Sequence, residues 1–164
     1  MNCTVCRGKL ASERGDVDFD ASGLPVTLHG VETRVCRSCG EREVVVPNIE
    51  GLHRALADLL IRKPRRLAGR EIRFLRKFLG WSGVDFARHM GVTPETASRW
   101  ETDANAIGGT ADRLLRLQVA CRQPVADYSP DALRDLERNA GRPLHLDLRV
   151  RRGQWKSVVA GAAA

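Results

Sequence analysis

Two cysteine pairs near the N-terminus limit the possible folds of this chain more than any other feature of its sequence. Each pair has the spacing C-x2-C, and the four residues are Cys3, Cys6, Cys36 and Cys39. Each pair can present two sulfurs from one tight turn, and four thiolates complete the closed tetrahedral site that holds structural Zn²⁺. We therefore expect one structural zinc ion per chain and no open coordination position for a catalytic water.

Two alternative interpretations of the same cysteines are an iron site and a redox-active pair. Iron in place of zinc stays open, because ligand identity alone does not separate the two metals. A thioredoxin-like redox pair would need a βαβ setting that Cys3, two residues from the terminus, cannot have. His29 lies between the pairs, but its alternating surroundings favour an exposed strand histidine over a ligand.

The residues between the cysteine pairs indicate short strands. Apolar and polar residues alternate in three segments: 17–19, 26–28 and 31–35. Turns are expected at Gly15, Gly23 and Gly30, and Gly8 and Gly40 should let the backbone amides face the sulfurs. Because so small a β-rich unit has little core, metal binding should supply much of its folding free energy.

Residues 49–69 predict a connection between two domains. Apolar residues keep helical spacing from Ile49 to Ile61, and Pro64 should stop this helix. Residues 65–69 follow as a basic hinge, for which phosphate binding and a solvated linker are both open interpretations.

The segment from Gly80 to Thr102 predicts two short helices joined by a tight turn. Ser82 is a good N-cap for the first helix, and Gly91 ends it. Thr93 and Pro94 mark the start of the second helix. This outline is typical of a helix-turn-helix, although a plain helical hairpin has a similar pattern.

The segment resembles the Cro/repressor (XRE-type) helix-turn-helix. The matching residues are Phe86-Ala87, Gly91-Val92 and Ser98-Arg99-Trp100-Glu101. Two positions depart from the family pattern, since Gly83 stands where Gln is usual and Asp103 where Gly is usual. The resemblance implies that the second helix enters the major groove of operator DNA.

The expected DNA contacts lie on the outer face of the second helix and on the helix before the pair. They are Thr93, Glu95, Thr96, Ser98, Arg99, Arg73 and Lys77. Arg99 can donate two hydrogen bonds to guanine, and Thr93 with the helix N-terminus can hold a phosphate. The competing role for Arg99 is a surface ion pair with Glu95, four residues earlier.

The charge balance agrees with a polyanionic partner. The formal net charge is +7, and basic residues crowd the segment from Arg54 to Lys77, directly before the helix pair. No apolar run is long enough to cross a membrane and no leader begins the chain, so we expect a cytoplasmic protein with reduced thiols.

The order of the two modules resembles the MqsA family of antitoxins, in which a YgiT-type zinc finger precedes an XRE-type helix-turn-helix. The resemblance implies a homodimeric repressor that binds operator DNA, neutralises a ribonuclease-like toxin and is not an enzyme. A stand-alone regulator, whose zinc domain senses or binds another partner, is the alternative. A metalloenzyme or thiol redox protein is a third hypothesis, from a different class.

The expected fold class is α+β. A zinc-binding domain (1–48), a connecting helix and hinge (49–69) and an all-α helix-turn-helix domain (70–122) precede an extension (123–164). The helix after Thr110 has more apolar surface than one face needs and is a candidate dimer contact, and Cys121 is expected in its core. The extension should hold a helix from Ser129 and a β-hairpin after Leu144, with a disordered tail.

Overall fold

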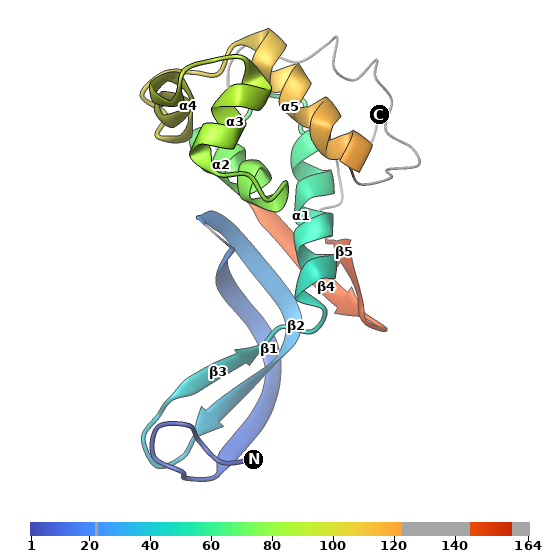
Figure 1. Cartoon of the computed structure of the whole chain (residues 1–164). Coiled ribbons are helices and arrows are strands. Elements are labelled where there is room, and N and C mark those ends of the chain that lie inside the picture. Colours follow the sequence, from blue (N-terminus) through green and yellow to red (C-terminus); the bar gives the residue numbers. More distant parts are fainter. Residues whose placement is uncertain (22, 123–144, 159–164) are drawn as a thin grey trace. The chain divides into compact units, whose positions relative to one another are not determined.

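The computed structural model describes residues 1–21, 23–122 and 145–158. This part of the chain has an α+β fold with five strands and five helices (Figure 1). It divides into two compact units. The sheet unit is Met1–Asp20, Pro25–Leu52 and His145–Ala164, and the helical unit is Ala21–Leu24 and His53–Leu144. The predicted helix from Ser129 lies outside the described residues.

The sheet is built around one long strand that has three neighbours. Strands β1 (Leu10–Ala21) and β2 (Leu24–Cys36) form a hairpin. The other edge of β2 is shared: residues 32–35 pair antiparallel with β3 (Arg42–Val45), and residues 26–29 pair parallel with β4 (Leu146–Arg151). Strand β5 (Gln154–Ser157) pairs with β4. The predicted C-terminal hairpin is therefore present, as part of the sheet.

Two of the three expected glycine turns are wrong. Gly15 lies inside β1 and Gly30 inside β2. The reversal between these two strands is at Gly23, which has φ +94°. Gly30 has φ +70°, and its N–H donates to Asp16 Oδ1 at 3.2 Å. A left-handed residue is tolerated there because β2 changes partner from β4 to β3 at this point.

The C-terminal hairpin is fixed by its inner face. Leu146, Leu148 and Trp155 are buried. The indole Nε1 of Trp155 donates to the carbonyl of Pro47 at 3.0 Å, and Asn48 Nδ2 donates to the carbonyl of Gly153 at 3.1 Å. These contacts satisfy the buried indole and tie the hairpin to the end of the β3 segment.

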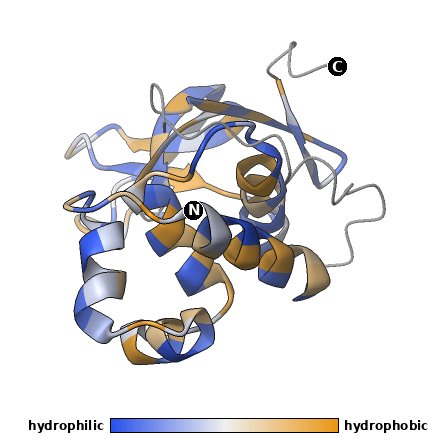
Figure 2. Cartoon of the chain, turned by 90° about the horizontal axis from the view of Figure 1, so that it is seen from above, coloured by the Kyte–Doolittle hydropathy of each residue, from blue (hydrophilic) through white to orange (hydrophobic). Residues whose placement is uncertain are grey.

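The remaining elements are helices: α1 (Ile49–Arg62), α2 (Gly69–Phe78), α3 (Gly83–Met90), α4 (Pro94–Glu101) and α5 (Gly109–Arg122). Hydrophobic and hydrophilic residues share several of the helices, as Figure 2 shows, so that one face of each can be buried. In the helical unit the fully buried apolar side chains include Leu56, Leu60, Ile72, Leu75, Phe86 and Leu115. No helix among the described residues is long and apolar enough to cross a membrane.

The expected basic hinge is held by buried hydrogen bonds. Arg116 of α5 is fully buried, and its guanidinium donates to the carbonyls of Ile61, Lys63 and Arg65. Asp112 accepts from Arg116 Nε at 2.6 Å and from the Leu67 N–H at 3.0 Å. The backbone between α1 and α2 is therefore fixed to α5.

Much of the basic run is neutralised by acidic partners. Lys63 Nζ donates to Glu71 at 2.8 Å, and both side chains are buried. Arg62 pairs with Asp58 at 2.9 Å. The run therefore offers fewer free cations to a polyanion than its sequence suggests.

Two expectations about α5 are wrong. The helix begins at Gly109, so Thr110 lies inside it and does not cap it. Cys121 is exposed, because it follows the exposed residues Leu114 and Leu117 on the outer face of the helix.

Candidate metal centre and nucleic-acid interface

The four predicted ligands meet at one end of the sheet unit. The Sγ atoms of Cys3, Cys6, Cys36 and Cys39 all lie within 4.8 Å of one another. Cys3 Sγ is 3.7 Å from Cys39 Sγ, and Cys6 Sγ is 3.4 Å from Cys36 Sγ. Four sulfurs so arranged are compatible with one tetrahedral metal site, as the sequence predicted.

The two cysteine turns have the same backbone pattern. The residue after the second cysteine of each pair is left-handed, with φ 61° at Arg7 and 76° at Gly40. Each donates its N–H to the carbonyl of the first cysteine, at 3.0 Å to Cys3 and 2.9 Å to Cys36. Two equivalent turns therefore present two sulfurs each.

Gly8 has a second role besides the expected one. The left-handed residue of the first turn is Arg7, whereas a Cβ on Gly8 would lie 2.6 Å from Ser38 Oγ. The N–H of Gly8 also points to Cys6 Sγ at 3.4 Å. Gly8 thus permits close approach of the two turns, and its amide faces a sulfur as predicted.

The four thiols cannot easily ionise together. Backbone N–H groups of Cys39 and Ser38 lower the pKa of Cys36 to about 6. The Glu41 amide lowers the pKa of Cys39, but the hydrogen bond with Cys6 and desolvation outweigh it and raise that pKa to about 12. A bound divalent cation would offset the repulsion among neighbouring thiolates. The donor set fits zinc and also accommodates iron.

His29 is neither a metal ligand nor an exposed strand residue. Its ring is half-buried, with Nδ1 2.8 Å from Asp16 Oδ2 and Nε2 2.9 Å from Asp147 Oδ1. Hydrogen bonding to Asp147, and then to Asp16, raises the pKa of His29. Asp147 comes from the distant strand β4, so alternation within one segment could not reveal this pairing.

Local signals in the sequence explain how α3 and α4 begin and end. The Ser82 hydroxyl accepts from the Asp85 N–H at 3.1 Å, and Gly91 ends α3 with φ 66°. The Thr93 hydroxyl accepts from the Thr96 N–H at 3.3 Å, with Pro94 at the first helical position. The predicted caps are therefore present, and a short turn joins two eight-residue helices.

The inner face of α4 is packed and ion-paired. Ala97 and Trp100 are buried, and the Trp100 ring meets Phe86 of α3 edge to face at 6.4 Å. Glu101, at the end of α4, forms a two-pronged ion pair with Arg76 of α2. Arg76 is consequently half-buried, whereas helical periodicity predicts that it faces outward.

Asp103 performs two tasks just after α4. It has φ 58°, a conformation in which Gly would have no steric cost. Its carboxylate accepts from the Gly69 N–H at 2.6 Å, at the start of α2. Asp103 thus supplies a contact that Gly could not make.

The outer face of α4 carries most of the predicted DNA contacts. Glu95, Ser98 and Arg99 are exposed, and Thr96 is half-buried. The N–H of Glu95, the Thr93 hydroxyl and the charge of Arg99 lower the pKa of Glu95. Within the described part of the chain, the guanidinium of Arg99 makes no hydrogen bond or ion pair and is available to a ligand.

The two basic residues predicted on α2 differ in availability. Arg73 Nε lies 3.5 Å from Glu101 Oε2, although the Arg73 side chain remains 44% exposed. Lys77 is exposed, with no salt bridge to another described residue. Lys77 therefore keeps its full charge for a partner, whereas Arg73 shares the carboxylate of Glu101.

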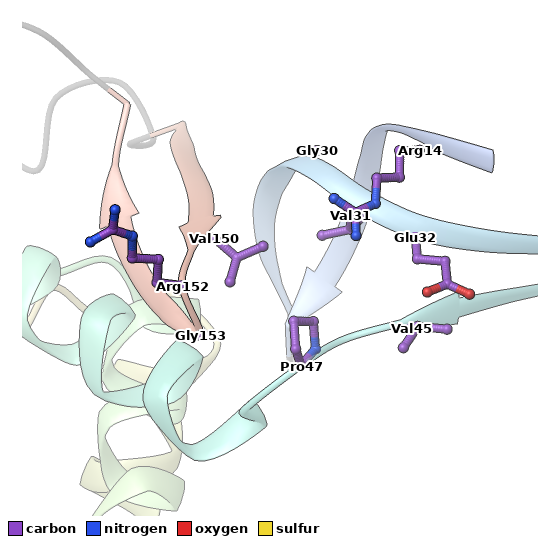
Figure 3. Close-up of a pocket in the computed structure, with 9 residues that line it drawn as sticks. All are labelled: Arg14, Gly30, Val31, Glu32, Val45, Pro47, Val150, Arg152 and Gly153. Atoms are coloured by element: carbon purple, nitrogen blue, oxygen red, sulfur yellow. The ribbon is translucent and has the colours of Figure 1, made fainter. Parts of the chain in front are cut away.

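A cavity of about 300 Å³ lies in the sheet unit where β2 changes partner (Figure 3). Val31, Val45, Pro47 and Val150 give it apolar walls. Glu32, on its rim, is held by Arg34 at 2.8 Å, so its charge is already compensated. Arg14 and Arg152 also line the cavity, so its polar lining is mainly cationic.

Comparison with known proteins finds no relative of this chain. No family model, no curated protein and no solved structure matches the chain. Its function therefore has to be inferred from its own residues.

Proposed function

We propose that this protein is a sequence-specific DNA-binding repressor. The observation that carries the proposal is the division of α4 into two faces. Ala97, Trp100 and Glu101 hold the helix against α2 and α3, while Arg99 stands exposed with no described partner. A rigidly held helix with a free arginine on its outer face suits the major groove of duplex DNA.

In this proposal α4 reads the base edges. Arg99 donates two hydrogen bonds to the O6 and N7 of a guanine. Glu95, four residues earlier, orients Arg99 or accepts from a cytosine amino group. Thr93 and the first amides of α4 contact a phosphate, and Lys77 adds charge from α2.

The proposed repressor is a homodimer that binds a palindromic operator. Leu114 and Leu117 of α5 are exposed, at 36% and 43% of their surface. An apolar stripe on the outside of a helix can pair with a second copy of itself across a two-fold axis. Two α4 helices would then read half-sites about one turn of DNA apart.

We assign the metal a structural role, because all four ligands come from the protein. The resemblance to MqsA-family antitoxins extends the proposal to a second partner, a small ribonuclease-like toxin. A stand-alone regulator remains the alternative. Co-expression with the neighbouring gene product separates the two: a stable complex supports the antitoxin, and no complex with a neighbouring ribonuclease contradicts it.

The DNA-binding proposal is tested by selecting sites from a pool of random duplexes and repeating the measurement with Arg99→Ala. Removal of a bidentate contact to guanine should reduce discrimination at one base pair by about 1–3 kcal/mol. Arg42→Ala is the matched control, because Arg42 is an exposed arginine on β3 of the sheet unit. Unchanged selectivity of Arg99→Ala would overturn the role of Arg99.

A further inference from the structure

The outer face of the β4–β5 hairpin is strongly basic. The hairpin alternates: Leu146, Leu148 and Trp155 point into the core and are buried. The opposite face exposes Arg149, Arg151 and Lys156, and Arg152 follows in the turn. A cavity of about 240 Å³ lies against the first three of these cations.

Two of these cations face each other across the strands. Arg149 is the register partner of Lys156, and like charges directly opposite in an antiparallel pair destabilise it. The hairpin's one acidic residue in the described range, Asp147, is hydrogen-bonded to His29. The hydrogen bond with His29, and to a smaller extent the positive charge of Arg149, lower the pKa of Asp16 on β1.

Apart from this electrostatic interaction between Asp16 and Arg149, the basic face has no acidic partner among the described residues. Across the described ranges, Arg149, Arg151 and Lys156 form no ion pair. A partner that brought negative charge to this face would remove the repulsion between Arg149 and Lys156. The cross-strand pair thus favours a polyanion over a neutral partner.

The hairpin holds these cations on a fixed support. Parallel pairing with β2, the Trp155 indole bond to Pro47 and the bond from the Val158 N–H to the Asp147 carbonyl all fix its backbone. Arg152, in the turn of the hairpin, lines the cavity of Figure 3 together with Val150. A pre-formed cationic surface loses less conformational entropy on binding than a flexible tail would.

We infer that the outer face of the β4–β5 hairpin binds the phosphate backbone of duplex DNA, as a contact separate from that of α4. The inference rests on the proposed function only for the choice of DNA as the polyanion. Single-stranded nucleic acid is disfavoured because the hairpin's one aromatic residue, Trp155, faces inward and cannot stack on bases. An acidic protein is disfavoured because the described part of this face exposes no aromatic anchor of the kind that interfaces use, and Val158 is its one exposed large apolar residue.

The test compares the salt dependence of DNA binding by the full chain and by the double variant Arg151→Gln/Lys156→Gln. The probe is a short duplex of random sequence. Removing one phosphate-binding cation should reduce the slope of log K against log salt by about 0.9, so the double variant should have a slope smaller by about 1.8. Its affinity should fall equally on every duplex sequence, since phosphates carry no base information.

The matched control is Lys9→Gln/Arg42→Gln, which removes the same charge from an exposed lysine and an exposed arginine of the same unit. For this control, the slope of log K against log salt should equal the wild-type slope, apart from the small effect of the lower net charge. Equal slopes for the hairpin variant and the wild type would overturn the inference. Unchanged DNA binding with weakened binding to polyglutamate would also overturn it, in favour of an acidic protein partner.

Two further outcomes separate the inference from the proposed function. If Arg99→Ala loses base selectivity while the hairpin variant keeps its slope, only the hairpin contact is wrong. If the hairpin variant lowers the slope while Arg99→Ala keeps its selectivity, the hairpin contact stands and the assignment of α4 fails. A greater fall in affinity for a single strand than for the duplex would contradict the choice of duplex DNA.

Discussion

At Gly69, the first residue of α2, the backbone lies directly against the end of α4. A Cβ at this position would lie 2.7 Å from the carbonyl oxygens of Trp100 and Glu101. Because these are backbone atoms, the contact cannot be relieved by rotating a side chain. Gly69→Ala should therefore lower the free energy of unfolding by about 1–3 kcal/mol, measured by urea denaturation followed through the helical circular dichroism signal.

Gly83→Ala is the control for this prediction. A Cβ on Gly83, in the first turn of α3, meets nothing within 4 Å, and the backbone there is helical. The substitution should be neutral or raise stability by about 0.4–1 kcal/mol, because alanine restricts the unfolded chain. Equal effects of the two substitutions would show that the close contact at Gly69 does not matter.

His29 links three strands, and its protonation should make the sheet unit sensitive to pH. The Asp147 and Asp16 hydrogen bonds raise its pKa above the ordinary value of 6.5. The stabilisation that these bonds give is full below pH 6.5 and is lost as the pH rises through the raised pKa. The difference in unfolding free energy between wild type and His29→Gln should therefore shrink between neutral and alkaline pH.

His53→Gln serves as the control for that profile, since His53 packs edge-on against Phe74 at 5.9 Å. Its effect on stability should not follow the same pH curve. Titration by nuclear magnetic resonance gives a direct check, in which the pKa of His29 should lie above 6.5. A pKa of His29 at or below 6.5 would contradict the prediction.

At the scale of elements, the sequence predicts what is specified locally. The cysteine spacing anticipated the sulfur cluster, and the caps at Ser82 and Thr93 anticipated the starts of α3 and α4. Pairings between distant segments were missed. The sequence around Arg116 suggests a surface cation. The side chain is nevertheless fully buried, because its guanidinium donates hydrogen bonds to backbone carbonyls more than fifty positions earlier in the chain.

The strands show the same contrast between features that the local sequence predicts and pairings between distant segments that it does not. Alternation located apolar positions in β2 and β4, but nothing local indicates that these two strands pair in parallel. The glycines at 15 and 30 predict turns because glycine occurs in turns and loops more often than in the interior of long strands. Gly30 instead occupies the point of partner exchange in β2, which depends on segments far away in the chain.

At the scale of the whole molecule, removing metal should affect the two units differently. The sheet unit holds the four-cysteine cluster, whereas the helical unit has a core of its own. Structural zinc in small domains contributes about 10–16 kcal/mol of binding free energy, far more than a small sheet's own stability. Chelation should therefore abolish the unfolding transition of the sheet unit and leave that of the helical unit, measured by calorimetry.

Cysteine variants give the matched comparison. Cys36→Ser removes a buried member of the cluster and should release the metal, whereas Cys121→Ser alters an exposed cysteine outside it. Bound metal is measured by atomic emission on the purified proteins. Full metal content in Cys36→Ser, or unfolding of both units on chelation, would contradict a metal role confined to the sheet unit.

The shared edge of β2 has a consequence for synthesis on the ribosome. The cysteine turns and β3 can assemble once Val45 has emerged, but residues 26–29 must wait for Leu146 to Arg149. During that interval the nascent chain displays an open strand edge with Leu28 uncovered. A truncated chain that lacks β4 should therefore aggregate or recruit chaperones, because the sheet that β1 and β2 begin is completed only after more than a hundred further residues have been translated.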